Sequence, residues 1–316
     1  MKYALKRILT LLLTMLLVSF LTFVAFELIS GDPAQTILGT EATPESLAAL
    51  RHELGLDRPF LTRYVSWLAG FFSGDLGISF RYRIPVWELI GPKLEITLCM
   101  CLVSFVIITA VSIPLAIWSY RFVGGPFDWV RTAFNQLCMA VPPFFTGILI
   151  SWLFGVILKL FLPGDFPDLH TNFGAALGHL FFAALCLCIP RTAMTVRMMR
   201  STVIGEMQKA YVRTAISRGN DRRQVLNRHV LKNSLAATVT FLGQTMAELV
   251  GGSVVVEQVF GIPGLGRLLV ASISTRDYPV VETLVVILAF WVVLAGTVAD
   301  LVNQRIDPRL RLGGDA

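Results

Sequence analysis

Charged residues are scarce in this sequence. Only 15% of its 316 residues are charged, whereas 55% are hydrophobic and the mean hydropathy is +0.68. A soluble domain carries about 25% charged residues, so the composition favours an integral membrane protein. Six apolar stretches are long enough to cross a hydrocarbon core of about 30 Å, and the third is long enough to be tilted or to end in a re-entrant turn. These stretches lie at 8–30, 94–118, 132–161, 176–196, 235–256 and 281–303.

Motifs for catalysis are also missing. A GxxxxGK[ST] phosphate loop is excluded because no Gly-Lys pair occurs in the chain, and neither HExxH nor CxxC appears. The four histidines are scattered and belong to no nucleophile signature: His52, His170, His179 and His229. We therefore expect no enzyme activity from this chain alone, no metal site and no cofactor of its own.

Cysteines are few, and all of them fall within the predicted spans. Residues two apart on a helix point about 200° away from each other, so neither C-x-C pair forms a chelate. A disulfide framework is disfavoured for the same reason. We interpret the five as small packing residues: Cys99, Cys101, Cys138, Cys186 and Cys188.

The distribution of Lys and Arg predicts the orientation of the chain. The first apolar stretch follows a basic start and could be a signal peptide, but it is longer than a signal-peptide core and no A-x-A-like cleavage site follows, so we expect a retained span. With both termini in the cytoplasm, 18 of the 27 basic residues lie inside. We thus predict an all-α protein with six transmembrane helices. Its parts are a tail and first span (1–30), an outside helical loop (31–93), a five-helix core (94–304) that contains a cytoplasmic loop (197–234), and a cytoplasmic tail (305–316).

The outside loop carries two helix signals. Thr43 supplies an N-cap, Pro44 a first-turn proline and Glu45 an early acid, which starts a helix that Gly55 ends. A second amphipathic piece follows, which lies along the outer membrane surface or packs on the bundle; the loop as a whole is either a lid or a docking surface. The apolar face of this piece is predicted to contain Phe60, Leu61, Tyr64, Val65, Leu68 and Phe72.

The cytoplasmic segment YVRTAISRGNDRRQVLNRHVLKN (211–233) is strongly basic and keeps helical apolar spacing on both sides of Gly219-Asn220. Asp221-x-x-Gln224 has the form of a capping box, and Gly219 stands where a left-handed helix end needs a residue without Cβ. We predict two short helices joined at this point. The alternative is a basic loop that contacts only lipid phosphates.

Charged residues within spans are costly in lipid and usually face a cavity or a partner. Glu248 is the deepest, in the fifth span, and Arg191 follows Pro190 in the fourth. Glu248 faces either a translocation path or an Arg or hydroxyl of a partner subunit. One deep carboxylate does not make the relay that a proton-coupled carrier needs.

Several motifs together resemble the permease subunits of bacterial ATP-binding-cassette (ABC) importers, in the branch that takes up dipeptides, oligopeptides, nickel and metal chelates. The similarity covers nearly the whole chain. It is carried by KRILTLLLTMLLVSFLTF running into GDPA, GLDRP (55–59), GDLGISF (74–80), RIPVWE (83–88), VVVEQVFGIPGLGRLL (254–269), RDYPVVE (276–282) and DPRLR (307–311).

The resemblance implies a role for the basic segment. In such importers a cytoplasmic loop docks in a groove of the ATPase subunit, and RTAISRG (213–219) aligns with its motif. Ala215 and Gly219 match, Arg213 and Thr214 replace Glu and Ala, and Ala237 stands where a proline is usual. The implied coupling residues are Arg213, Thr214, Ala215, Arg218, Gly219, Asn220 and Asp221.

The resemblance also implies partners and a location. These are a second similar permease forming a heterodimer, two ATP-binding subunits that carry ATP and Mg²⁺, an extracytoplasmic substrate-binding protein and membrane lipid, in the bacterial inner membrane; no nucleic acid is implied. Loop 31–93 and the IPGLGR turn are the implied surfaces for the binding protein. That turn consists of Ile262, Pro263, Gly264, Leu265, Gly266 and Arg267.

The cargo is open between two classes. ELVGGSVVVEQ (248–258) resembles nickel and metal-chelate importers somewhat more than dipeptide importers, so our first expectation is nickel, metal chelates or small peptides, with a dipeptide or oligopeptide importer as the alternative. A membrane anchor that recruits a cytoplasmic protein and a self-sufficient carrier are weaker alternatives.

Overall fold

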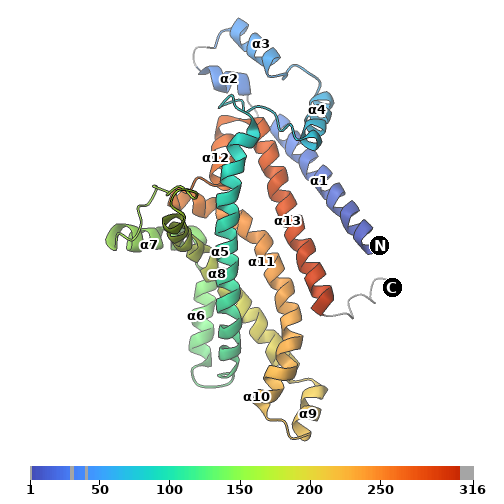
Figure 1. Cartoon of the computed structure of the whole chain (residues 1–316), viewed down its shortest axis with the longest axis vertical. Coiled ribbons are helices and arrows are strands. Elements are labelled where there is room, and N and C mark those ends of the chain that lie inside the picture. Colours follow the sequence, from blue (N-terminus) through green and yellow to red (C-terminus); the bar gives the residue numbers. More distant parts are fainter. Residues whose placement is uncertain (1, 29–31, 40–41, 307–316) are drawn as a thin grey trace. The chain divides into compact units, whose positions relative to one another are not determined.

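The computed structural model describes residues 2–28, 32–39 and 42–306, so the DPRLR motif and most of the predicted tail lie outside the described residues. In these ranges the regular structure is helical, apart from a single β-bridge between Ile78 and Pro85. Figure 1 shows the helices. Their bounds are α1 (Lys2–Leu28), α2 (Pro33–Leu38), α3 (Pro44–Glu53), α4 (Phe60–Ser73), α5 (Val86–Tyr120), α6 (Asp128–Ala140), α7 (Pro143–Ile150), the π-helical segment η2 (Ser151–Ile157), α8 (Phe173–Met207), α9 (Ala210–Ser217), α10 (Arg222–Val225), the π-helical segment η3 (Leu226–Val230), α11 (Leu231–Phe260), α12 (Leu265–Thr275) and α13 (Tyr278–Ile306).

The prediction of an all-α chain with membrane spans is confirmed. Five helices in the described residues are long and apolar enough to cross a membrane, and a bent pair raises the number to six if it counts as one span. These five correspond to the predicted first, second, fourth, fifth and sixth stretches.

The third predicted span is not a straight helix. It divides into α6 and α7 with η2, and the two pieces are bent by 93°. The break falls at Val141 and Pro142, which both adopt extended backbone, with ψ of 121° and 142°. Two successive prolines cause it, because a proline disfavours helical backbone in the residue before it and has no N–H to donate.

The helices around the predicted loop 197–234 are longer than the sequence indicates. α8 continues to Met207, and Arg222–Phe260 forms one continuous helical stretch of 39 residues through α10, η3 and α11. The predicted loop 197–234 therefore shrinks to residues 208–221. The added helical segments contain several basic residues, which hydropathy leaves out of a span although they are compatible with a helix.

Residue contacts divide the chain into two compact units, which we describe separately. The first consists of the described residues up to Thr97 with Pro263–Val293, and the second of Leu98–Ile262 with the described residues from Leu294 on.

The first predicted helix of loop 31–93 forms as expected. The Thr43 hydroxyl accepts a hydrogen bond from the Ser46 N–H at 3.2 Å, and the Ser46 hydroxyl accepts one from the Thr43 N–H at 3.0 Å, which makes a full capping box. Gly55, with φ of +66°, follows the end of α3.

The predicted face of α4 is wrong in part. The face that packs on α1 consists of Phe60, Tyr64, Trp67 and Phe71, whose rings meet each other and Phe20 and Phe23 of α1. By contrast Leu61, Val65 and Phe72 are 64%, 61% and 73% exposed. The helix is apolar on two neighbouring stripes, so periodicity could not tell which one is buried.

Two of the motifs meet within the first unit. Asp277 of RDYPVVE is fully buried, and its carboxylate accepts the Phe80 N–H at 2.8 Å, the Arg81 N–H at 3.4 Å and the Ser79 hydroxyl. The Ser79 hydroxyl in turn accepts the Tyr82 N–H at 2.9 Å. Asp277 thus fixes the turn after GDLGISF against the start of α13.

The second unit is built on α8 and α11, with α6 and α7 packed against them. Close approach depends on glycine at two places on α11. A Cβ at Gly243 would lie 1.9 Å from the Cβ of Ala299 in α13, and one at Gly252 would lie 3.1 Å from Leu187 of α8.

Candidate coupling loop and translocation path

The loop between α8 and α10 contains one short helix, α9, which ends in a Schellman motif. Gly219 has φ of +86°, its N–H donates to the Ile216 carbonyl at 2.9 Å, and the Asn220 N–H donates to the Ala215 carbonyl at 3.3 Å. The Asn220 side chain donates to the same Ala215 carbonyl at 3.1 Å. The predicted left-handed glycine is confirmed, and it turns the chain back towards α10.

The second predicted short helix is instead the beginning of a long one. Asp221 caps α10 by accepting the Gln224 N–H at 2.6 Å, which is one of the two hydrogen bonds of the predicted capping box. From Arg222 the helix then runs through the π-helical segment η3 into α11 without a break. Any displacement of the loop at Asp221 therefore acts directly on the end of a spanning helix.

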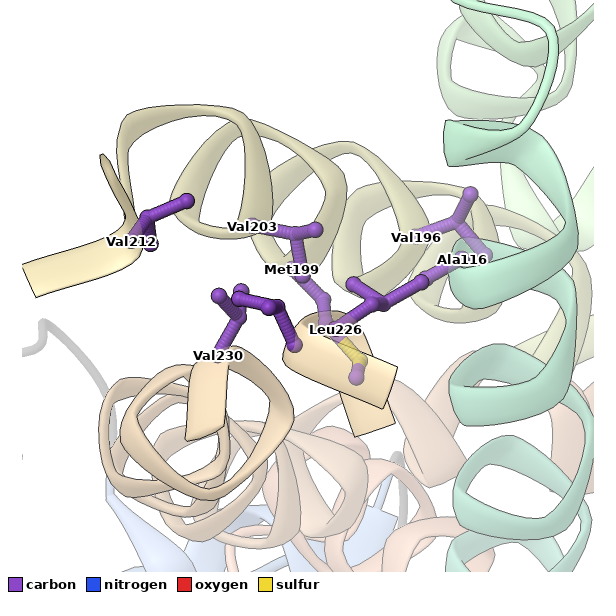
Figure 2. Close-up of a cluster of buried hydrophobic side chains, with 8 residues drawn as sticks. Ala116, Val196, Met199, Val203, Val212, Leu226 and Val230 are labelled. Carbon is purple, nitrogen blue, oxygen red and sulfur yellow. The ribbon is translucent and has the colours of Figure 1, made fainter. Parts of the chain in front are cut away.

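A cluster of buried side chains joins the loop to three long helices (Figure 2). Val212 is the residue that α9 contributes, and it is 2% exposed. Around it lie residues of α8, of α10 with η3, and one of α5. They are Val196, Met199 and Val203, then Val225, Leu226 and Val230, and Ala116. Because protein interiors are close-packed, α9 cannot move without displacing these helices.

A polar network holds the near end of α9. The Tyr211 hydroxyl donates to the Glu206 carboxylate at 2.8 Å and accepts a bond from the Asn233 side chain at 3.3 Å, while Lys209 pairs with the same carboxylate. Burial, and then the bond to Glu206, raise the pKa of Tyr211 above its usual value, so it remains a neutral donor at physiological pH.

The outward side of the loop is exposed and basic. Of the predicted coupling residues, Ala215 and Asn220 are half-buried and the other five are exposed. Ile216 adds an apolar side chain that is 41% exposed. The exposed arginines of α9, its C-cap, α10 and η3 are Arg213, Arg218, Arg222, Arg223 and Arg228.

Sequence reasoning missed a second polar network in this unit, which is centred on Asp128 and includes the Asp128–Arg200 clamp. Asp128, at the start of α6, receives two hydrogen bonds from one Arg200 nitrogen at 2.7 and 2.8 Å, a bond from Arg131, and the Gly124 N–H at 3.1 Å. Arg200 lies on α8 between Met199 and Val203 of the buried cluster. The signal available in the sequence was an acid in the first turn of an amphipathic helix, which by itself names no partner.

Glu248 of α11 is paired within this chain. Its carboxylate contacts the guanidinium of Arg191 on α8, and the two side chains are 53% and 28% exposed. Both residues lie near the middle of their helices. The alternative in which an arginine of another subunit satisfies Glu248 is therefore not required, although the pair keeps an open side.

The IPGLGR turn is mostly interior. Ile262, Gly264, Leu265 and Gly266 are buried and Pro263 is half-buried, so only Arg267 presents an exposed side chain. Leu265 donates its N–H to the Thr97 hydroxyl at 2.8 Å. This arrangement assigns a packing role to most of the turn.

Among the described residues no group of three or more His, Cys, Asp or Glu side chains could hold a metal ion. All five cysteines are free thiols in the structure.

Two protein-family models match this sequence and together span most of it. One, described as "Binding-protein-dependent transport system inner membrane component", matches residues 112–312, and its N-terminal counterpart matches residues 1–101. The chain belongs to this family of permeases.

Curated relatives of this permease match over almost their full length. A peptide transport system permease protein of Brucella abortus (strain 2308) is 37% identical over 308 residues, 97% of this chain and 98% of the relative. The dipeptide transport system permease protein DppB of Escherichia coli (strain K12) is 31% identical over 335 residues, 98% of this chain and 99% of that protein.

A solved structure supports the fold. A chain of the MetNI methionine ABC transporter in an inward-facing conformation aligns with a TM-score of 0.55 and 19% identity, over 69% of this permease and 96% of that chain.

Membership of the family confirms several expectations. The permease is an inner-membrane component with multiple spans; it is not itself catalytic, and it works with ATP-binding and substrate-binding partners. The two relatives are named for peptide and dipeptide transport, and the solved structure is named for methionine transport. The comparisons therefore favour our alternative, a dipeptide or oligopeptide cargo, over our first expectation of nickel or metal chelates.

Proposed function

We propose that this permease forms half of the translocation path of an ABC importer for dipeptides or short oligopeptides. The supporting observation is its full-length similarity, at 31% identity, to a dipeptide transport system permease protein, together with 37% identity to a peptide transport system permease protein. The cargo is thus a property of those relatives that we extend to this chain.

In the proposed mechanism the exposed side of α9 docks on an ATP-binding subunit, with Arg213, Thr214, Arg218 and Gly219 at the contact. When that subunit moves on ATP binding, Val212 and its cluster transmit the motion to α8, α11 and α5 as a rigid body. The Schellman turn fixes the angle between α9 and α10, and hence the direction of the displacement.

The proposed assembly places two such permeases side by side. We propose a heterodimer with a second, similar permease, two ATP-binding subunits, and both termini of this chain in the cytoplasm. The excess of Lys and Arg in the loop 208–221 and in the ends of the helices beside it supports this orientation.

For the extracytoplasmic binding protein we propose the helical loop 31–93 as the docking surface. Of the IPGLGR turn, only Arg267 has the exposure that a contact requires. The stripe of Leu61, Val65 and Phe72 on α4 is exposed and apolar, which suits the outer membrane surface.

Reconstitution tests the cargo. The permease is purified with its accompanying subunits and placed in proteoliposomes with ATP inside and binding protein outside, and uptake of a labelled dipeptide is compared with uptake of nickel. We expect ATP-dependent dipeptide uptake and no nickel uptake. Nickel uptake without dipeptide uptake would reject the peptide proposal and favour the nickel or metal-chelate importer instead.

A further inference from the structure

One face of α11 is exposed along much of its length. The exposed residues recur at intervals of four, three, four and three, which places them in a single stripe on the helix: Gln244, Glu248, Gly251, Val255 and Gln258. The stripe extends over 15 residues, whose ends are about 21 Å apart along a hydrocarbon core of roughly 30 Å.

This stripe is too polar to face lipid. Two amide side chains and a carboxylate in the described spanning part of a helix need water or polar partners, because a bilayer offers no hydrogen bonds. The mean hydropathy of this span is 1.4, the lowest of the five spanning helices, whose values otherwise run from 1.9 to 2.6. By comparison, Leu102 and Val106 of α5 are 56% and 57% exposed and wholly apolar, as a lipid-facing surface should be.

The other sides of α11 are occupied within this chain. Gly252 packs against Leu187 of α8, and Gly243 packs against Ala299 of α13. At Gly251, on the stripe, a Cβ would meet nothing within 4 Å. The stripe therefore faces open space, and the Arg191–Glu248 pair lies at its edge.

We infer that this stripe of α11 lines the translocation path and contacts the cargo, with Gln244, Glu248 and Gln258 as the residues that meet it. Amide side chains both donate and accept hydrogen bonds, and the carboxylate accepts them, so together they match the N–H and C=O groups and the ammonium end of a peptide. The assignment to peptides rests on the proposed function, whereas the assignment of the stripe to the path rests on exposure and polarity alone.

Cysteine accessibility in the assembled importer tests the stripe. In a background whose five native cysteines are replaced by alanine and which still transports, single cysteines are placed at 244, 251, 255 and 258 and treated with a charged, water-soluble thiol reagent. Leu102→Cys and Val106→Cys are the matched controls, since they are exposed to a similar degree. We expect reaction at the four stripe positions to be at least about ten-fold faster, because a thiol surrounded by lipid stays protonated and inaccessible.

Two outcomes overturn the inference. Equal reactivity of stripe and control cysteines would show that the stripe has no special access to water. Slow reaction in the assembled importer combined with fast reaction in the separated chain would show that the second permease packs on the stripe instead.

A bulk substitution supplies a second measurement. A Cβ at Gly251 would meet nothing within 4 Å, so we expect Gly251→Trp to give an assembled importer with ATPase activity and at least about ten-fold lower uptake, because the side chain projects into the path. Val106→Trp adds a similar side chain to the lipid-facing control position and should transport normally. Equal loss in both variants would refute a path-specific effect.

The two proposals fail in different ways. If dipeptide uptake occurs but the stripe cysteines do not react with the thiol reagent, the stripe assignment is wrong and the peptide proposal is retained. If the stripe cysteines react but no peptide is transported, the peptide proposal is wrong and the path assignment stands.

Discussion

Gly219 offers the sharpest test of the coupling loop, because only its backbone conformation is special. Its φ of +86° lies in the left-handed region, whereas a Cβ at this position would meet nothing within 4 Å. A Gly219→Leu substitution therefore adds backbone strain of about 1–2 kcal/mol and no steric clash. The two bonds of the Schellman motif together contribute about 1–3 kcal/mol. The strain is of the same size, so the turn opens in a large fraction of molecules.

The expected result is loss of coupling rather than loss of the protein. In proteoliposomes with the partner subunits, we expect Gly219→Leu to retain ATP hydrolysis but to transport roughly five- to thirty-fold less peptide per ATP, which is the factor that about 1–2 kcal/mol represents. Gly219→Asn should stay close to wild type, since asparagine tolerates left-handed backbone. Gly205→Leu is the matched control, because Gly205 is also exposed with open space around it but lies within helix α8.

Normal transport by Gly219→Leu, or an equal defect in Gly205→Leu, would refute this reasoning. In the first case the angle between α9 and α10 does not matter for coupling. In the second the defect arises from side-chain bulk at the loop and not from the turn.

Three further predictions concern the contacts behind the loop and the turn at Ser79 that Asp277 holds. Val212→Ala removes two buried methyl groups and should cost about 2–3 kcal/mol locally, seen as a lower ratio of transport to ATP hydrolysis with the complex still assembled. Asp128→Asn and Arg200→Gln should each weaken transport, and because both break the same pair, the double variant should be little worse than either single variant in a double-mutant cycle. Asp277→Asn should lower the midpoint of thermal unfolding of the complex, since a buried carboxylate with bonds to Ser79 and two backbone N–H groups contributes about 1.5–3 kcal/mol per charged bond; an unchanged midpoint would contradict this.

The spans could be predicted from the sequence because twenty apolar residues in a row have few alternatives to a membrane helix. The ends of the helices could not. Hydropathy marks the edge of the hydrocarbon, whereas α8 ends at Met207 and α10 begins at Arg222, next to the capping residues Gln208 and Asp221. The 93° bend at Val141–Pro143 was visible only as excess length, although the two prolines in the sequence were its cause.

At the candidate site, local features were predictable and long-range contacts were not. The Gly219 turn and the Asp221 cap depend on residues within a few positions, so sequence spacing describes them fully. The Asp128–Arg200 clamp joins residues 72 positions apart, and nothing in either helix alone favours the other.

The two apolar stripes of α4 show the same limit within one helix. Tyr64 is on the buried side because its hydroxyl meets the Ser19 hydroxyl of α1 at 3.0 Å, a contact that periodicity cannot supply. A helix that is apolar over most of its surface needs a partner to decide which face is inside.

The Arg191–Glu248 pair is another contact that the sequence alone did not predict, and it bears on function. From the sequence, Glu248 was a deep charge in a span that faces either a translocation path or an Arg or hydroxyl of a partner subunit. The structure makes it half of a neutral pair between α8 and α11, the same two helices to which Val212 and its cluster connect the loop. A displacement that separates α8 from α11 would therefore expose a carboxylate and a guanidinium together, which are the two groups that match the opposite ends of a zwitterionic peptide. Coupling motion and cargo contact would then act on the same pair of helices, so a variant that swaps the charges, Arg191→Glu with Glu248→Arg, should keep the pair and the assembly while altering which peptides are transported.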